Sequence, residues 1–197
     1  MASASEAALE HKWITKCLDG DTEAFGRLAE HHRGRVFRVV YGMLRNAEEA
    51  EDVTQEAFVK AFEALKRFDR KRPFLPWILS IATHLSIDRI RRAKRARGLA
   101  AEHPDAAALR PAGTEAADES LARRELREAL WRAVRELDGR MRSVLWLRDV
   151  EGRPTEEVAE MLGVAPPTVR VHLFKARARV REHLDREGPK GKKKHES

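Results

Sequence analysis

Cationic side chains gather in one stretch near the carboxyl end of this sequence, and their spacing suits the binding of phosphate. No acidic residue occurs between Pro167 and Glu182, and the bases of that stretch are Arg170, Lys175, Arg177, Arg179 and Arg181. Guanidinium and ammonium groups form charge-assisted hydrogen bonds with phosphate oxygens, so the stretch is a candidate nucleic-acid surface. The alternative is an ordinary helical hairpin with a solvated basic face.

Carboxylates gather in a second stretch. Residues 48–56 hold five acids and no base. Within a predicted helix, Asp52, Gln55 and Glu56 lie outside the apolar stripe. Clustered carboxylates can bind a metal or act as an acid–base pair, but this helix holds no histidine, and no second acidic motif stands at a matching distance. A contact surface for a basic protein partner is the favoured interpretation, and a solvated helix face is the alternative.

Histidine and cysteine give little support for a metal centre. His31 and His32 are adjacent, so on a helix they project to different faces, and we expect both to face solvent. Cys17 is the only cysteine. A single thiol excludes a disulfide within the chain and a thiolate zinc cluster. The sequence predicts no metal and no cofactor.

The composition limits the possible fold classes and the kind of binding partner. Hydrophobic residues make up 42% of the 197 residues, which suffices for a core, and charged residues make up 36%. Ala, Leu, Glu and Arg dominate, while runs that alternate at a period of two are few, so an all-α fold is predicted. The net charge of +7 indicates a polyanionic partner.

The amino terminus and the apolar runs bear on localisation. The segment MASASEAALEHKW carries acids and lacks the apolar core of a signal peptide. No apolar run approaches the roughly 20 residues of a membrane span. We therefore expect a cytoplasmic protein without membrane insertion.

Two helices with a tight turn are predicted over residues 152–184. Thr155 is expected to cap the first helix, and Gly163 to end it in a left-handed conformation. Pro166 and Pro167 fit only the first turn of a helix, so the second helix runs from about Pro167 to Leu184. Its apolar face comprises Val169, Leu173, Ala176 and Val180. A Gly-containing turn before a basic second helix is typical of a helix-turn-helix whose second helix enters the major groove of DNA.

Helices are also predicted in the first half of the chain. Asp21 or Thr22 can cap a helix that continues to Leu44, and Asn46 with Glu49 forms a capping box for the next one. A further helix, from about Trp77 to Ala96, becomes strongly basic, because residues 89–97 hold six bases and no acid. This exceeds what capping of the helix dipole needs, so we interpret it as a phosphate-binding surface.

The composition changes between Gly98 and Asp118, where eight of 21 residues are alanine. This stretch is predicted to be an interdomain linker. Beyond it, a helix over 119–137 is expected to bury Leu121, Leu126, Leu130, Val134 and Leu137. A further helix over 140–150 precedes the helix-turn-helix. The predicted organisation is a domain at 1–97, a linker at 98–119, a second domain at 120–187 and a basic tail at 188–197.

Three segments together resemble the bacterial RNA polymerase sigma factors of the small extracytoplasmic-function (ECF) class, in the sigma-70 family. They are AEDVTQEAFVKAF at 50–62, FLPWILSIATHLSIDRIRR at 74–92 and RSVLWLRDVEGRPTEEVAEMLGVAPPTVRVHLFKARARVR at 142–181. In order and spacing they are similar to the conserved regions two and four of that family. The resemblance implies two small helical domains joined by a flexible linker, with region two in the first domain and region four in the second.

The resemblance also implies three binding surfaces. Polymerase-binding residues would be Asp52, Gln55 and Glu56, which would dock on a coiled coil of the largest subunit of RNA polymerase. The minus-ten promoter element would be met by Trp77, His84, Arg89, Arg91, Arg92, Lys94 and Arg95. The minus-thirty-five element would be met by Thr168, Arg170, Val171, His172 and Lys175, with Arg177 and Arg179 on phosphates.

This sequence departs from the family pattern at three places. His84 stands where members often carry an asparagine that captures a flipped base, and Pro167 stands where a glycine is usual. The pair Val171 and His172 stands where Ser-Arg is common, which removes one cation and one hydroxyl. The preferred promoter sequence therefore cannot be transferred from relatives.

The implied function is promoter recognition and transcription initiation, in the service of a stress or envelope response. The implied partners are core RNA polymerase, promoter DNA and an anti-sigma factor, with no small-molecule substrate and no enzymatic activity. The alternative is a stand-alone helix-turn-helix regulator, which would need neither the acidic face at 48–56 nor the basic helix at 77–97. An enzyme acting on nucleic acid would need a nucleophile–base pair, a phosphate-binding Gly loop or a metal cluster, and the sequence offers none of these motifs.

Overall fold

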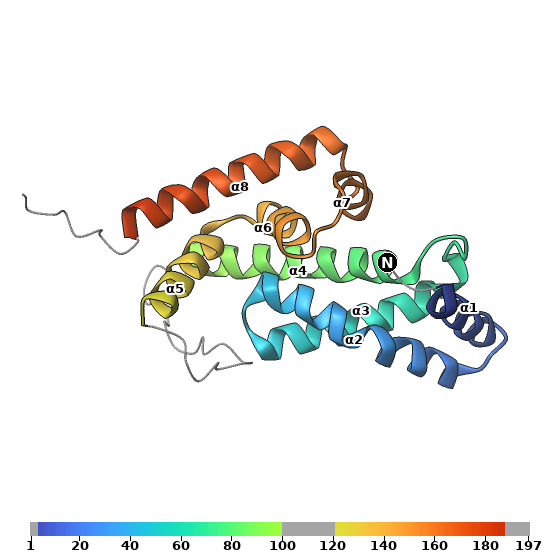
Figure 1. The fold of residues 1–197 in the computed structure, drawn as a ribbon. Coiled ribbons are helices and arrows are strands. Elements are labelled where there is room, and N and C mark those ends of the chain that lie inside the picture. Colours follow the sequence, from blue (N-terminus) through green and yellow to red (C-terminus); the bar gives the residue numbers. More distant parts are fainter. Residues whose placement is uncertain (1–3, 100–120, 188–197) are drawn as a thin grey trace, which may run out of the picture.

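The structure is a computed structural model, and it describes residues 4–99 and 121–187. Every regular element in these two ranges is helical, as the sequence predicts (Figure 1). The predicted linker at 98–119 and the basic tail at 188–197 lie almost entirely outside the described residues. Among the described helices, none combines the length and the apolar character that a membrane span requires.

Five elements form the first unit: α1 (Ala4–Leu18), α2 (Thr22–Leu44), α3 (Ala47–Ala64), the 3-10 turn η1 (Leu65–Arg67) and α4 (Phe74–Leu99). Helix α2 packs against α1, α3 and α4. Its Leu28, Val36 and Val39 are completely buried, as are Ala57 on α3 and Ile78 on α4. Burial of such side chains contributes about 1.5–3 kcal/mol each for the larger ones, so α2 is the centre of this core.

Local capping signals in the first unit are confirmed. The Asp21 side chain accepts the backbone N–H of Ala24 at the start of α2, and the Asn46 side chain accepts that of Glu49 at the start of α3. The expectation of a frayed segment over residues 1–12 is wrong from residue 4 onward. Helix α1 begins at Ala4, because its Glu10 and Ile14 pack against α2 and order the preceding turns.

Helices α5 (Leu121–Glu136), α6 (Gly139–Leu145), α7 (Thr155–Leu162) and α8 (Pro166–Glu187) form the second unit. Between α6 and α7, a π-helical turn, η2, spans Trp146–Val150, where the sequence predicted a continuation of one helix. Gly163 ends α7 with φ 62°, and this left-handed cap confirms the prediction. Thr155 does not cap α7. Pro154 occupies the cap position without a side-chain hydrogen bond, and Thr155 is the first helical residue.

The buried face of α5 differs from the predicted one. Leu121, Leu126 and Leu130 are 72%, 50% and 38% exposed, whereas Val134 and Leu137 are buried as expected. Helix α5 instead packs against α8 through its small side chains Ala129 and Ala133, which are both 2% exposed. Small residues allow two helix backbones to approach closely, and this turns the leucines of the amino-terminal half outward.

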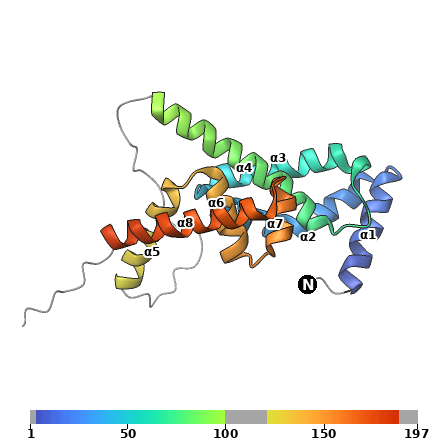
Figure 2. The ribbon, with the colours of Figure 1, turned by 90° about the horizontal axis from the view of Figure 1, so that it is seen from above.

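The two units lie against each other along α4. Figure 1 shows α4 between the α2–α3 layer below and α6, α7 and α8 above, and α4 packs against α2, α3, α6 and α7. Figure 2, the view from above, shows α8 crossing over α6. The Ser80 hydroxyl of α4 donates to the Met161 carbonyl of α7 at 2.7 Å. Gly42 of α2 faces the indole of Trp146, and Gly139 faces the backbone of Ile87. A single apolar cluster extends across both units, and the predicted division into two domains stays a prediction.

The buried side chain of Arg142 links the two units through hydrogen bonds. Its side chain lies on α6 and the residue is 6% exposed. One nitrogen donates to the Met43 carbonyl at 2.8 Å, and the other donates to the Arg135 carbonyl at 2.7 Å and the Leu137 carbonyl at 3.3 Å. These carbonyls lie at or near helix carboxyl ends, where a cation and a hydrogen-bond donor are both favourable.

Candidate functional site

Helix α3 presents an acidic face to solvent. Asp52, Gln55 and Glu56 are all exposed, and the helical spacing places them on one side of α3, opposite buried Val53 and Ala57. Glu51 is engaged inside the unit, because Arg33 of α2 pairs with it and Gln55 donates to it at 3.1 Å. The hydrogen bonds from Arg33 and Gln55 hold the pKa of Glu51 below its usual range.

Apolar side chains adjoin this acidic face. Val59 is 57% exposed and Phe62 is 43% exposed, and both follow Glu56 on α3. An edge-on contact with Phe25, at 5.1 Å between ring centres, ties the Phe62 ring to the core. Exposed apolar residues bordered by charges are typical of protein-docking surfaces.

The basic half of α4 is open to solvent. Arg91, Arg92, Lys94 and Arg95 are exposed and Arg89 is half-buried. Arg91 has a weak partner in Asp88, at 3.8 Å. A surface ion pair of this length contributes little, so this part of α4 keeps the electrostatic character of a polyanion-binding surface.

Trp77 and His84 occupy different environments on α4. Trp77 is half-buried, and its ring lies 4.7 Å from that of Phe68 and 5.5 Å from that of Phe74. This aromatic group fixes the start of α4 relative to the segment after η1. His84 is exposed, and its Nδ1 lies 2.8 Å from the Ser80 carbonyl, to which a protonated Nδ1 donates. That hydrogen bond orients the ring and leaves Nε2 for another partner.

On α8, Arg170, Val171 and Lys175 are exposed, while Thr168 and His172 are half-buried. Val169 and Leu173 are buried on the opposite side of α8, which packs against α6 and α7. This is the orientation that a recognition helix requires, because the polar side remains available to the groove. Phe174, at 76% exposure, is an exposed aromatic that the sequence analysis did not single out.

Arg177 and Arg179 contact neighbouring helices. Two nitrogens of Arg177 bind the Asp149 carboxylate at 2.9 and 2.5 Å, and this pairing raises the pKa of the guanidinium. Arg179 lies 3.5 Å from the sulfur of Met141. A phosphate would have to compete with Asp149 for Arg177, so this residue is a weaker phosphate ligand than its charge suggests.

The two predicted DNA-contacting helices, α4 and α8, contribute side chains to one pocket. One small pocket is lined by His84 and Arg91 of α4, by Arg140 of α6 and by Val164 and His172 of the helix-turn-helix. The structure therefore brings a predicted minus-ten residue and a predicted minus-thirty-five residue to the same cavity.

Comparisons with known proteins match both units. The family model described as Sigma-70 region 2 matches residues 28–96, and the one described as Sigma-70, region 4 matches residues 127–180. The ECF RNA polymerase sigma factor SigW of Bacillus subtilis is 30% identical over 178 residues, which span 88% of this chain and 95% of SigW. The ECF RNA polymerase sigma-E factor of Escherichia coli is 25% identical, over 89% of this chain and 94% of that protein.

Solved structures share the fold. CnrH, solved in complex with the cytosolic domain of CnrY, has a TM-score of 0.61 at 24% identity and covers 91% of this chain and 99% of its own. RpoE of Bartonella quintana, solved with the anti-sigma factor NepR, has a TM-score of 0.62 at 19% identity, over 83% of this chain and 98% of its own. Both regions, their order and the SigW match lead to one conclusion: this chain belongs to the ECF class of RNA polymerase sigma factors, in the sigma-70 family.

Proposed function

We propose that this sigma factor docks on core RNA polymerase through Asp52, Gln55 and Glu56 of α3. The observation that carries the proposal is the exposed acidic face beside Val59 and Phe62 on a helix whose other side is fully buried. Carboxylates steer and orient a basic partner, and the adjoining apolar side chains supply contact area. A stand-alone DNA-binding regulator would have no use for such a face.

Promoter DNA is the second partner in this proposal. The basic half of α4, with His84 beside it, would hold the minus-ten element, and Arg170, Val171, His172 and Lys175 of α8 would face the major groove of the minus-thirty-five element. Unstacking a base from the duplex costs a few kcal/mol of free energy, and binding of the released base in a pocket offsets this cost. The exposed cations of α4 would hold the backbone and contribute the salt-dependent part of the affinity.

Promoter binding in this proposal requires the two units to separate. His84 and half-buried His172 line one pocket, so in this closed arrangement of the two units the surface around His172 would be less accessible to duplex DNA. Contact with polymerase would hold the units apart. An anti-sigma factor would stabilise the closed form or cover it, by analogy with the relatives that were solved with CnrY and NepR. The protein would act in the cytoplasm, without catalytic activity of its own, on a stress or envelope regulon.

Charge reversal on α3 tests the docking surface. Asp52→Lys should remove binding to core RNA polymerase in a pull-down and reduce promoter-dependent transcripts at least tenfold. Glu30→Lys makes the same change of charge at an exposed position of α2 and should leave both intact. Equal polymerase binding by the two variants would contradict the assignment of the acidic face.

A further inference from the structure

A completely buried histidine lies in the middle of α2. His32 is 0% exposed, and the expectation that it faces solvent is wrong. Its ring is held between that of His31, 4.7 Å away, and that of Phe74, 5.4 Å away. Neither ring nitrogen makes an aligned hydrogen bond with a described residue. Its Nε2 lies 3.2 Å from Oε1 of Glu10. This distance would suit a hydrogen bond, but the relative orientation of the two groups does not.

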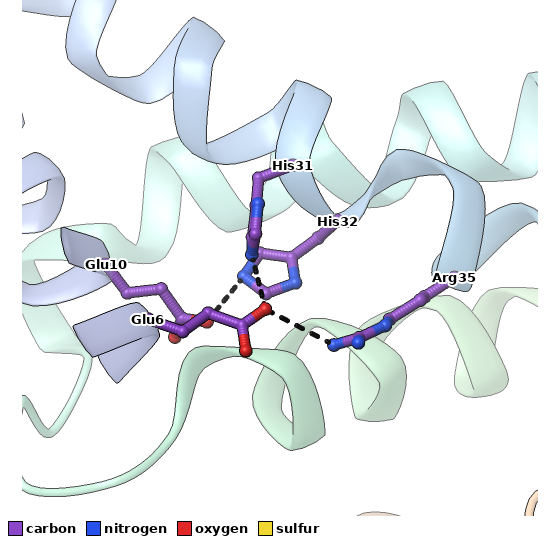
Figure 3. Close-up of polar contacts among 5 residues, drawn as sticks. All are labelled: Glu6, Glu10, His31, His32 and Arg35. Atoms are coloured by element: carbon purple, nitrogen blue, oxygen red, sulfur yellow. Dashed lines mark hydrogen bonds and ion pairs between the residues drawn. The ribbon is translucent and has the colours of Figure 1, made fainter. Parts of the chain in front are cut away.

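Three further polar groups surround this ring. The side chain of Glu10 of α1 is 12% exposed, and Nε2 of exposed His31 lies 3.1 Å from Oε1 of Glu6. Figure 3 shows both carboxylates of α1 directed at the two histidines of α2, with Arg35 on the far side of Glu6. One donor atom each from Glu10, His31 and His32 lies within 4.8 Å of the others. The rings of the two adjacent histidines therefore lie close together, and α1 supplies one carboxylate to each of them.

The charges around His32 suit a cation. Burial, together with the neighbouring His31 and Arg35, lowers the pKa of His32 to about 4. Two carboxylates against the single guanidinium of Arg35 leave the cluster with a net negative charge, which favours a cation.

We propose that Glu10, His31 and His32 bind a divalent transition metal of the zinc class, with Glu6 or a water molecule as the fourth ligand. Imidazole and carboxylate donors together favour Zn²⁺, Co²⁺ or Ni²⁺ over Mg²⁺ or Ca²⁺. Zinc bonds of about 2.0–2.1 Å place tetrahedral donors about 3.3 Å apart. Nε2 of His32 and Oε1 of Glu10 already have this spacing, at 3.2 Å, and so do Nε2 of His31 and Oε1 of Glu6, at 3.1 Å. The donor atoms of Glu10, His31 and His32 all lie within 4.8 Å of one another, so side-chain shifts that bring His31 closer to the other two would complete the site.

This metal site would be separate from the surfaces proposed for promoter recognition, and its position between helices gives it a structural role. Glu10 also accepts the backbone N–H of Phe74, the first residue of α4. A metal ion on Glu10 would therefore tie α1 and α2 to the start of α4, next to the segment over 68–73 that precedes it. Because the ligands come from two helices that separate on unfolding, the ion binds the folded chain and stabilises it.

Metal titration of the full-length protein tests the proposal without any transcription assay. After treatment with a chelator, Zn²⁺ should bind with a stoichiometry of one by calorimetry and raise the melting temperature by several degrees. Co²⁺ should give the visible absorption of a tetrahedral site. His31→Gln should weaken Zn²⁺ binding at least tenfold, and it changes an exposed side chain whose loss leaves the core intact. His32→Gln and Glu10→Gln should weaken binding at least as much.

His11→Gln is the matched control, because His11 is an exposed histidine on α1 outside the cluster. It should leave the affinity for Zn²⁺ unchanged. Absence of one-to-one binding would overturn the proposal, as would an affinity that His31→Gln leaves unchanged or that His11→Gln reduces equally. The histidines would then only pair with Glu6 and Glu10 to hold α1 on α2. Circular dichroism of His31→Gln establishes that a loss of binding is not a loss of fold.

Discussion

Gly42 of α2 lies so close to the indole of Trp146 that a β-carbon at this position would stand 2.1 Å from two of the ring atoms. The contact joins the first unit to the π-helical turn η2 of the second. The indole of Trp146 lies against the ring of Trp131, with 5.8 Å between the ring centres, so it cannot move aside easily. The absence of a side chain at Gly42 is therefore a condition of the closed arrangement.

Gly42→Ala is expected to separate the two units while each retains its helices. The new methyl group cannot share the space of the indole, so η2 must leave α2. Small-angle scattering should show a larger radius of gyration, with little change in far-ultraviolet circular dichroism. Affinity for promoter duplex should rise, because the surface around His172 is uncovered.

Gly26→Ala is the control for that experiment. Gly26 also lies on α2, and a β-carbon there meets nothing within 4 Å. Alanine is favoured over glycine in a helix by roughly 1 kcal/mol, so this variant should be at least as stable as the parent. A radius of gyration that is the same for both variants would show that Gly42 does not control closure.

Arg142→Met should destabilise the protein strongly. The guanidinium donates to the carbonyls of Met43, Arg135 and Leu137, and methionine would leave them without these hydrogen bonds in a buried site. The expected loss is about 3–5 kcal/mol in the free energy of unfolding, measured by urea denaturation. Arg140→Met changes an exposed arginine two residues away and should cost less than about 0.5 kcal/mol. Similar losses for both variants would contradict the role of Arg142.

Asp149 is expected to restrain the DNA affinity of α8. Its carboxylate binds Arg177 at 2.9 and 2.5 Å, so Asp149→Asn should release a cation and raise affinity for duplex DNA about two- to threefold.

Arg170→Ala should reduce the slope of log affinity against log salt by about 1, as expected for one lost phosphate contact. Arg177→Ala should change that slope by less than half as much. Equal slopes for the two arginine variants would contradict the neutralising role of Asp149.

Local signals made much of this fold predictable. Asp21 and Asn46 cap their helices, Gly163 ends α7, and the apolar periodicity of α3 and α8 places Val53 and Val169 in the core. Such features depend on residues three or four positions apart, and the sequence contains them directly. The exposed faces of α3, α4 and α8 follow from the same periodicity, and the order of the two regions was implied by the resemblance of three segments to the family.

Features that depend on distant contacts were not predictable. His32 is buried because α1 and Phe74 cover it, and helical periodicity alone places adjacent histidines on different faces. Leu126 is exposed because α5 meets α8 through Ala129 and Ala133 instead. Arg142 has carbonyl partners in both units, and nothing in its local sequence distinguishes it from a surface arginine.

The central claim is that this chain directs RNA polymerase to promoters, and run-off transcription tests it most directly. Core RNA polymerase would be incubated with a pool of promoter fragments, with and without the full-length protein, and the transcripts would be sequenced. Defined start sites that occur only when the protein is present are the predicted result, and they would reveal both promoter elements. Tight binding to duplex DNA without any new transcript would contradict the account and favour a stand-alone helix-turn-helix regulator.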